Sequence, residues 1–166
     1  MARWEPDLVV TQSLLERLID RDPASATEPP PTRAQSVRQL KASLRRDLEW
    51  LLNSRRTPEA VGNEFQELER SLYNYGLPDA TSLSWDSVRD RERLKRMIED
   101  TLRTFEPRLS DVQVVAVESS SNSQHVMRFQ IEALLDMDPS PEHISFDTLL
   151  QLSSGEYQVK GDLGAG

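Results

Sequence analysis

The sequence predicts an α+β fold, with N-terminal helices packed on one face of a small, mainly antiparallel sheet of three C-terminal strands. Two observations support this fold class. Apolar residues recur at helical spacing up to residue 105, and the apolar period changes to two after Pro107. Helices first and strands last are typical of α+β proteins. At 166 residues, the chain is long enough for one domain with its own core.

The N-terminal residues 1–20 predict one short helix. Its apolar side chains are Leu14, Leu15, Leu18 and Ile19, and Thr11 or Ser13 can cap it. Because so few turns are not stable alone, we expect this helix to dock on another element. Residues 21–35 follow, and their proline, alanine, serine and threonine predict an extended linker.

The main domain is predicted to span residues 36–160, and its first helix gives the clearest pattern, over residues 36–56. Ser36 and Gln39 have the spacing of a capping box, which marks a helix start. One continuous apolar stripe follows, made of Val37, Leu40, Leu44, Leu48, Leu51 and Leu52. This stripe predicts the side of the helix that packs in the core.

A shorter helix is expected next, because Phe65, Leu68 and Leu72 are three and four positions apart. The stretch "NYGLPD" then predicts a stop and a turn. Gly76 can adopt the left-handed conformation, and Pro78 prevents the helix from continuing.

A second long helix is predicted over residues 86–105, with Ser84 or Asp86 as its cap. Its apolar stripe is Leu94, Ile98, Leu102 and Phe105, helped by Val88 and Met97. Pro107 disfavours helical backbone at the residue before it, so this helix should end at about Phe105.

Three strands are predicted after the second long helix, over residues 112–117, 125–135 and 143–152. The middle one alternates polar and apolar residues, as a half-buried antiparallel strand does. The polar stretch "SSSNSQ" predicts a hairpin loop between the first two strands. Residues 161–166 are rich in glycine and predict a flexible tail.

Composition narrows the classes of function. The chain has no cysteine, which excludes disulfides, cysteine-based metal sites and thiol nucleophiles. Its formal net charge of −8 disfavours nucleic-acid binding. It has no long apolar run and no secretory signal, so we expect neither a membrane span nor secretion. Phosphate-binding loops and nucleophile elbows are also absent, and His125 and His143 lack the spacing of metal ligands. We therefore expect no cofactor, no metal site and no catalytic residue.

The stretch "FEPRL" contains the candidate site residues Glu106, Pro107 and Arg108. In an extended segment, Glu106 and Arg108 point to the same side, and Pro107 makes their presentation rigid. The simplest interpretation is a corner with an internal ion pair, and the second is a docking point. A third is a glycosidase that uses Glu106 with Asp111. Arg108 argues against it, since a neighbouring cation favours the ionised carboxylate whereas a general acid needs its proton.

Four stretches in register resemble the TssE family of type VI secretion baseplate subunits, which is related to the wedge protein of contractile phage tails. They are "SLLERLID", "LRRDLEWLLNSR", "SLYNYGLPD" and "FEPRL". The resemblance covers about residues 8 to 152. It implies a structural, non-enzymatic role in a cytoplasmic baseplate beneath the bacterial inner membrane. The family's E-P-R motif falls on Glu106, Pro107 and Arg108, which by resemblance support baseplate and sheath assembly.

The resemblance also implies protein partners: the baseplate subunits TssF, TssG and TssK, and the sheath subunits TssB and TssC. It implies no nucleic acid, no membrane insertion and no small-molecule substrate. An open sheet edge can accept a partner strand, so we expect strand addition at the C-terminal sheet to start the sheath. Two alternatives are a peptidoglycan hydrolase, matching the family's "lysozyme-like" label, and an adaptor that binds a partner helix through its leucine stripe.

Overall fold

The structure is a computed structural model. It describes residues 10, 12–19, 23, 31–59, 62, 65–80, 82–84, 87–117 and 126–162. Three sequence predictions fall largely or wholly outside these residues: the hairpin loop "SSSNSQ", most of the linker at 21–35, and the end of the tail at 163–166. His125 also lies outside the described residues.

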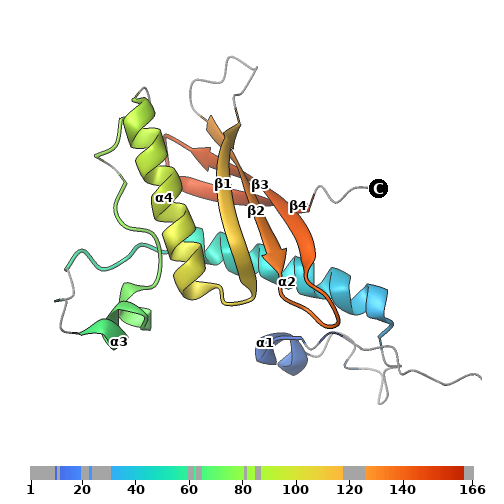
Figure 1. The fold of residues 1–166 in the computed structure, drawn as a ribbon. Helices are drawn as coiled ribbons and strands as arrows, with labels where there is room; N and C mark the ends of the chain where they lie inside the picture. The colour runs from blue at the N-terminus through green and yellow to red at the C-terminus, as the bar shows by residue number, and fades with distance from the viewer. Residues whose placement is uncertain are drawn as a thin grey trace, which may run out of the picture.

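The helices of the described chain precede its strands, as predicted (Figure 1). They are α1 (Leu14–Leu18), α2 (Arg33–Asn53), α3 (Gln66–Glu69), the short 3-10 helix η1 (Leu72–Asn74) and α4 (Val88–Phe105). The strands are β1 (Leu109–Val117), β2 (Val126–Leu135), β3 (Glu142–Gln151) and β4 (Glu156–Asp162). None of the helices in the described part of the chain is long and apolar enough to cross a membrane.

The strands form one antiparallel sheet in the order β1-β2-β3-β4. The predicted number of three strands was wrong, because β4 adds a fourth and extends into the predicted tail. Tyr157 and Val159 on β4 are buried and alternate with exposed neighbours. Only two apolar residues carry that alternation, next to a glycine-rich stretch, so the pattern is too short to stand out in the sequence.

The starts of the two long helices also differ from the prediction. Thr32 caps α2 and forms a capping box with Gln35, so residues 33–35, expected in the linker, are helical. Ser36, the predicted cap, is instead buried one turn inside the helix. Ser87 caps α4, one residue after the predicted range began.

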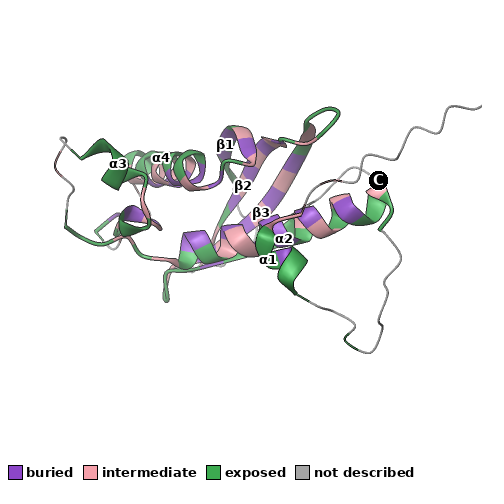
Figure 2. Cartoon of the chain, turned by 90° about the horizontal axis from the view of Figure 1, so that it is seen from below, coloured by how far each residue is buried: buried purple, intermediate pink, exposed green. Residues whose placement is uncertain are grey.

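One hydrophobic core joins the two long helices to the sheet. The leucines of the predicted stripe on α2 are all at most 5% exposed: Leu40, Leu44, Leu48, Leu51 and Leu52. Burying each such side chain contributes ~1.5–3 kcal/mol. In Figure 2, buried and exposed positions alternate along α2 and along the strands. The helix α2 contacts β4, and α4 contacts β1. The predicted packing of the helices on one face of the sheet stays a prediction.

The short helix predicted after α2 is confirmed by α3. Phe65, Leu68 and Leu72, whose spacing predicted this helix, are 56%, 38% and 84% exposed. The predicted stop at Gly76 is confirmed, since this glycine has a φ of +106°. The next residue, Leu77, donates its N–H to the Ser54 carbonyl (2.9 Å), which ties the turn to the end of α2.

Replacing Gly76 by alanine should destabilise the fold strongly. A Cβ at this position would lie 2.3 Å from the Ser54 carbonyl oxygen, and the positive φ adds strain. We expect Gly76→Ala to lower the free energy of unfolding by more than about 2 kcal/mol, measured by urea denaturation. The matched control is Gly155→Ala, where φ is +71° but the nearest atom to the new Cβ is 3.6 Å away. That control should lose only about 1 kcal/mol. Equal losses in the two variants would contradict the close approach at Gly76.

Candidate functional site

The candidate site begins at the charged corner, which we define as Glu106, Pro107 and Arg108, between α4 and β1. Pro107 disfavours helical backbone at Glu106, whose φ of −121° and ψ of 78° lie outside the helix. The Glu106 N–H still donates to the Leu102 carbonyl (2.9 Å), and the Leu109 N–H donates to the Glu106 carbonyl (3.1 Å). The helix therefore ends where the sequence predicted, and β1 begins at Leu109.

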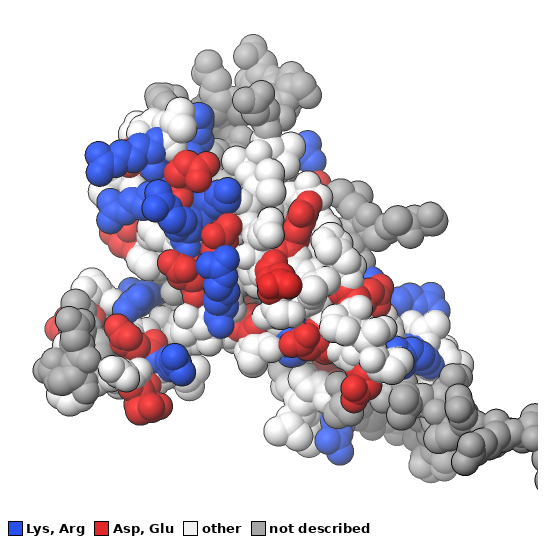
Figure 3. Space-filling model, viewed as in Figure 1, with Lys and Arg blue, Asp and Glu red and all other residues white. Residues whose placement is uncertain are grey.

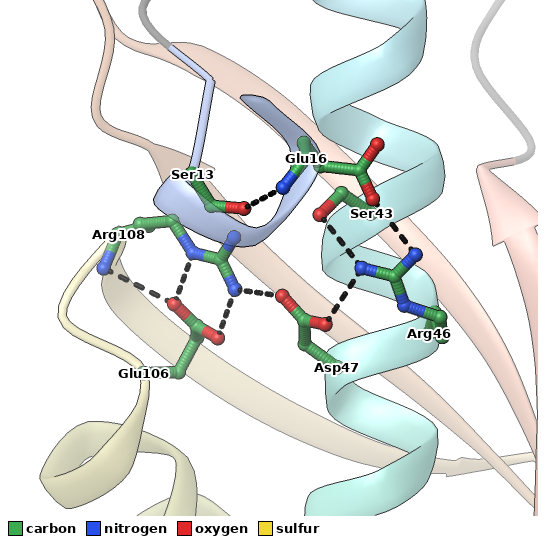
Figure 4. A network of polar contacts seen from close by, with 7 residues as sticks. All are labelled: Ser13, Glu16, Ser43, Arg46, Asp47, Glu106 and Arg108. Carbon is green, nitrogen blue, oxygen red and sulfur yellow. Dashed lines mark hydrogen bonds and ion pairs between the residues drawn. The ribbon is translucent and has the colours of Figure 1, made fainter. Parts of the chain in front are cut away.

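Glu106 and Arg108 form a two-point ion pair within this corner (Figure 4). Arg108 Nε donates to Glu106 Oε1 at 2.5 Å, and Nη2 donates to Oε2 at 2.6 Å. The hydrogen bond to Glu106 raises the pKa of Arg108 above its ordinary value despite the opposing effect of burial, so the guanidinium stays charged. Glu106 is only 5% exposed, which makes Arg108 the partner that compensates a buried charge.

The corner is tied to α2 by a second acid. Arg108 Nη2 also donates to Asp47 Oδ2 at 2.8 Å, although the two residues are 61 positions apart in the sequence. Tyr75 packs edge-on against Phe105 beside this contact, with 5.5 Å between the ring centroids. Burial raises the pKa of the Tyr75 hydroxyl, and the negative charges of Asp47 and Glu106 raise it further. Tyr75 therefore stays neutral and fills the apolar side of the corner.

The polar contacts continue from Asp47 to the N-terminal helix (Figure 4). Arg46 Nη2 lies 3.4 Å from Asp47 Oδ1, and Arg46 Nη1 lies 2.7 Å from Glu16 Oε1. The bond to Glu16 is the largest of the effects that raise the pKa of Arg46. Glu16 is only 6% exposed, so α1 is attached to α2 by a buried carboxylate.

This attachment uses a polar side chain of α1 and not its aliphatic residues. The four aliphatic residues of this segment are exposed, by 75% at Leu14, 48% at Leu15, 80% at Leu18 and 42% at Ile19. The sequence predicted a docking helix without naming its partner or its docking face, and the contact described here joins Glu16 to Arg46. Helical spacing identified the apolar residues of α1. It could not show that Glu16 would form an ion pair with Arg46, which lies on another helix.

The two edges of the sheet form the second part of the candidate site, and α4 covers the middle of the β1 edge. The Val114 N–H donates to Glu99 Oε1 at 2.9 Å, and Arg103 Nη2 donates to the Val112 carbonyl at 2.8 Å. Glu99 and Arg103 are four positions apart and also form an ion pair, at 3.6 Å. We call them the edge-capping pair of β1.

The helix α2 covers the β4 edge in the same way. Asn53 Oδ1 accepts from the Tyr157 N–H at 2.9 Å, while Asn53 Nδ2 donates to the Tyr157 carbonyl at 2.8 Å. The Val159 N–H donates to Glu49 Oε2 at 3.2 Å. An amide side chain has both a donor and an acceptor, so Asn53 takes the place that a neighbouring strand would occupy. Glu49 and Asn53, again four positions apart, are the edge-capping pair of β4.

These caps limit the positions at which a partner strand could pair with the sheet. The middle of each edge strand is already occupied by the chain's own side chains, which the sequence prediction did not include. Beyond Val114, the backbone groups of Ala116 point to the same open side, because strand residues alternate with a period of two. Ala116 is exposed, and its neighbour Val115 is 43% exposed. The last residues of β1 are thus the described part of this edge that is accessible to a partner strand.

The geometry of Glu106 and Asp111 does not favour the acid pair that the hydrolase alternative uses. Both carboxylate oxygens of Glu106 accept from Arg108, whereas a general acid needs a proton to donate. Asp111 is exposed and has a φ of +49°. It lies at the irregularity in the pairing of β1 with β2, which accounts for this backbone conformation. A pocket of about 350 Å³ lies between the end of α2 and the β3–β4 turn, and Asp79 is the one acid in its described lining.

Removing the Asn53 cap should open the β4 edge. We expect Asn53→Ala to cost about 1–3 kcal/mol of stability, because the Tyr157 N–H and carbonyl lose their partners. The variant should also self-associate through the exposed edge as its concentration rises, measured by analytical ultracentrifugation. Gln158→Ala is the control, since Gln158 is an exposed residue of the same strand. Equal sedimentation of both variants and the unchanged chain at all concentrations would show that Asn53 does not protect the edge.

A protein-family model matches the part of the chain that contains the charged corner. The model of the baseplate wedge protein gp25 matches residues 38–140. The match includes most of α2, all of α4, β1 and β2, and therefore the charged corner, while β3 and β4 lie outside it. Neither the comparison with curated proteins nor that with solved structures found a significant match.

Proteins of the baseplate wedge family are structural components of phages and secretion systems. Their role is assembly with other baseplate proteins. The matched range covers more than half of the 166 residues. The chain therefore belongs to the family of the baseplate wedge protein gp25, which is also the family of TssE.

Proposed function

We propose that this chain is a TssE-like subunit of a bacterial type VI secretion machine. In this role it joins TssF, TssG and TssK in a cytoplasmic baseplate beneath the inner membrane, and helps to start the sheath of TssB and TssC. Family membership supports the baseplate role. The four stretches that resemble TssE support the secretion machine over a phage tail. The chain needs no cofactor for this role and breaks no bond.

The charged corner is the proposed contact to other baseplate subunits, and its geometry carries the proposal. Pro107 is exposed, and the Arg108 side chain is 26% exposed, so a partner can reach both. Glu106 lies beneath them, held by Arg108, and Asp47 ties the corner to α2. A surface that is already rigid loses little conformational entropy when it binds, which favours an assembly contact.

The sheath contact is proposed at the end of β1. A strand from a sheath subunit that pairs with Ala116 extends the sheet without displacing a cap, whereas pairing at Val112 or Val114 requires Glu99 and Arg103 to leave. Backbone hydrogen bonds supply affinity at such an edge, and the side chain of Val115 can add apolar contact. The proposal therefore places sheath initiation on the free end of β1 and away from β4.

The charge pair of the corner should be needed for assembly, and its removal as a pair should leave the chain folded. Replacing Arg108 alone leaves a buried, unpaired carboxylate and risks unfolding. The double variant Glu106→Gln with Arg108→Met removes both charges and is the cleaner test. In a bacterium that carries this chain, we expect about tenfold fewer sheaths in the double variant, counted by fluorescence of labelled TssB.

The control for the corner is Arg38→Met, which removes an exposed arginine from α2. Circular dichroism checks that both variants are folded. Normal sheath numbers in a folded double variant would contradict the role of the corner. A separate assay measures the turbidity of a cell-wall suspension. If the unchanged chain lowers the turbidity and Glu106→Gln does not, the result favours the peptidoglycan hydrolase.

The β1 edge is tested separately by Ala116→Pro. The N–H of Ala116 points away from β2, so proline removes a donor on the open side and leaves the pairing with β2 intact. We expect a folded chain that still joins the baseplate, measured by pull-down with TssF and TssG, but starts about tenfold fewer sheaths. Unchanged sheath numbers would rule out strand addition at this position.

A further inference from the structure

The first half of α4 is basic in an otherwise acidic protein. Residues 88–96 contain five basic and two acidic side chains, a formal charge of +3. The whole chain has a formal net charge of −8, so the remaining residues together carry −11. Figure 3 shows Lys and Arg side chains gathered over α4, at the upper left of that view. This charge separation concentrates positive potential on one helix.

Three arginines form a line along the exposed side of this helix. Arg89, Arg93 and Arg96 are four and three positions apart, so they share one face. All three are exposed, whereas Leu94 and Ile98 are completely buried. We call Arg89, Arg93 and Arg96 the arginine stripe.

The arginine stripe has no ion pair with any described residue. The one side-chain hydrogen bond found for its members in the described chain joins Arg96 Nε to the Glu92 carbonyl at 3.3 Å. In contrast, Arg103 at the other end of α4 pairs with Glu99 and Asp100. The same helix thus neutralises its C-terminal arginine and leaves its N-terminal arginines available.

The position of the stripe separates it from the charged corner. From Arg96 to Glu106 there are ten residues, a distance of roughly 15 Å along a helix. The residues that bridge this distance include Glu99 and Arg103, which are already engaged with β1. A partner on the stripe therefore need not contact the corner.

We propose that the arginine stripe binds an acidic helical segment of a partner protein. The stripe spans about 10 Å, two turns of helix, so a partner helix with carboxylates four and three positions apart matches its three guanidinium groups. This inference goes beyond the proposed function, since neither the family match nor the corner requires it.

An acidic protein segment fits the stripe better than a nucleic acid does. A long polyanion extends past the stripe and is repelled by the rest of the chain, which has a formal charge of −11. A short acidic segment stays within a Debye length, about 8–10 Å, of the stripe. Nucleic-acid surfaces also pair basic residues with aromatic side chains for base stacking. The one aromatic residue of α4 is Phe105, at its far end.

The test uses a fluorescein-labelled helical peptide with glutamates four and three positions apart, and a matched glutamine peptide. We expect fluorescence anisotropy to show binding of the glutamate peptide alone, and that binding weakens as salt rises. The variant Arg89→Glu, Arg93→Glu, Arg96→Glu should lose at least about tenfold in affinity and should bind a matched lysine peptide instead. All three side chains are exposed and Arg89 lies in the first turn, where an acidic residue is favourable, so this variant should stay folded.

The control is Arg17→Glu, Arg38→Glu, Arg45→Glu, which changes the net charge equally at exposed arginines of α1 and α2. It should keep its affinity for the glutamate peptide within about twofold. An equal loss in both triple variants would show that only net charge matters and would overturn the proposal. Absence of binding at millimolar peptide, or tighter binding of a single-stranded oligonucleotide than of the glutamate peptide, would overturn it as well.

Discussion

The corner depends on one buried carboxylate, that of Glu106. The corner in turn determines how α4 is joined to the sheet. Glu106 is almost inaccessible to water, so its charge must be compensated within the protein. Arg108 supplies that compensation two positions later, and Pro107 between them limits the backbone to a bend. Asp47 then binds the same guanidinium from α2. The order acid–proline–base thus fixes how a helix turns into an edge strand, and it joins that turn to the other long helix.

The helices also act on the sheet edges. Each long helix presents two polar residues four positions apart, and each pair binds the backbone of one edge strand. Edge strands with free backbone groups promote uncontrolled association, and these caps prevent it in the middle of both edges. Under the proposed mechanism of sheath initiation, this leaves the end of β1 as the acceptor. Under that mechanism, a subunit that starts a polymer benefits when its sheet grows at one edge only.

Much of the architecture could be predicted from the sequence, because local patterns determine it. The apolar stripe of α2, the end of α4 before Pro107 and the alternation of β2 all depend on residues within a few positions of each other. The pairing of Glu106 with Arg108 has the same local origin. The contacts that could not be predicted join distant positions: Asp47 is far from Arg108 in sequence, and Glu16 is selected by Arg46 on another helix. Polar pairs such as Glu49 and Asn53 look like an ordinary solvated helix face until the strand beside them is known.

Whether Arg108 compensates the buried charge of Glu106 can be measured by a double-mutant cycle of unfolding free energies. The variants are Glu106→Gln, Arg108→Met and the two together, each measured by urea denaturation at neutral pH. We expect Arg108→Met alone to cost about 3–5 kcal/mol, and the addition of Glu106→Gln to recover a large part of this loss. If the two single losses instead add up to the loss in the double variant, the residues are not coupled and the buried carboxylate is not what holds the corner.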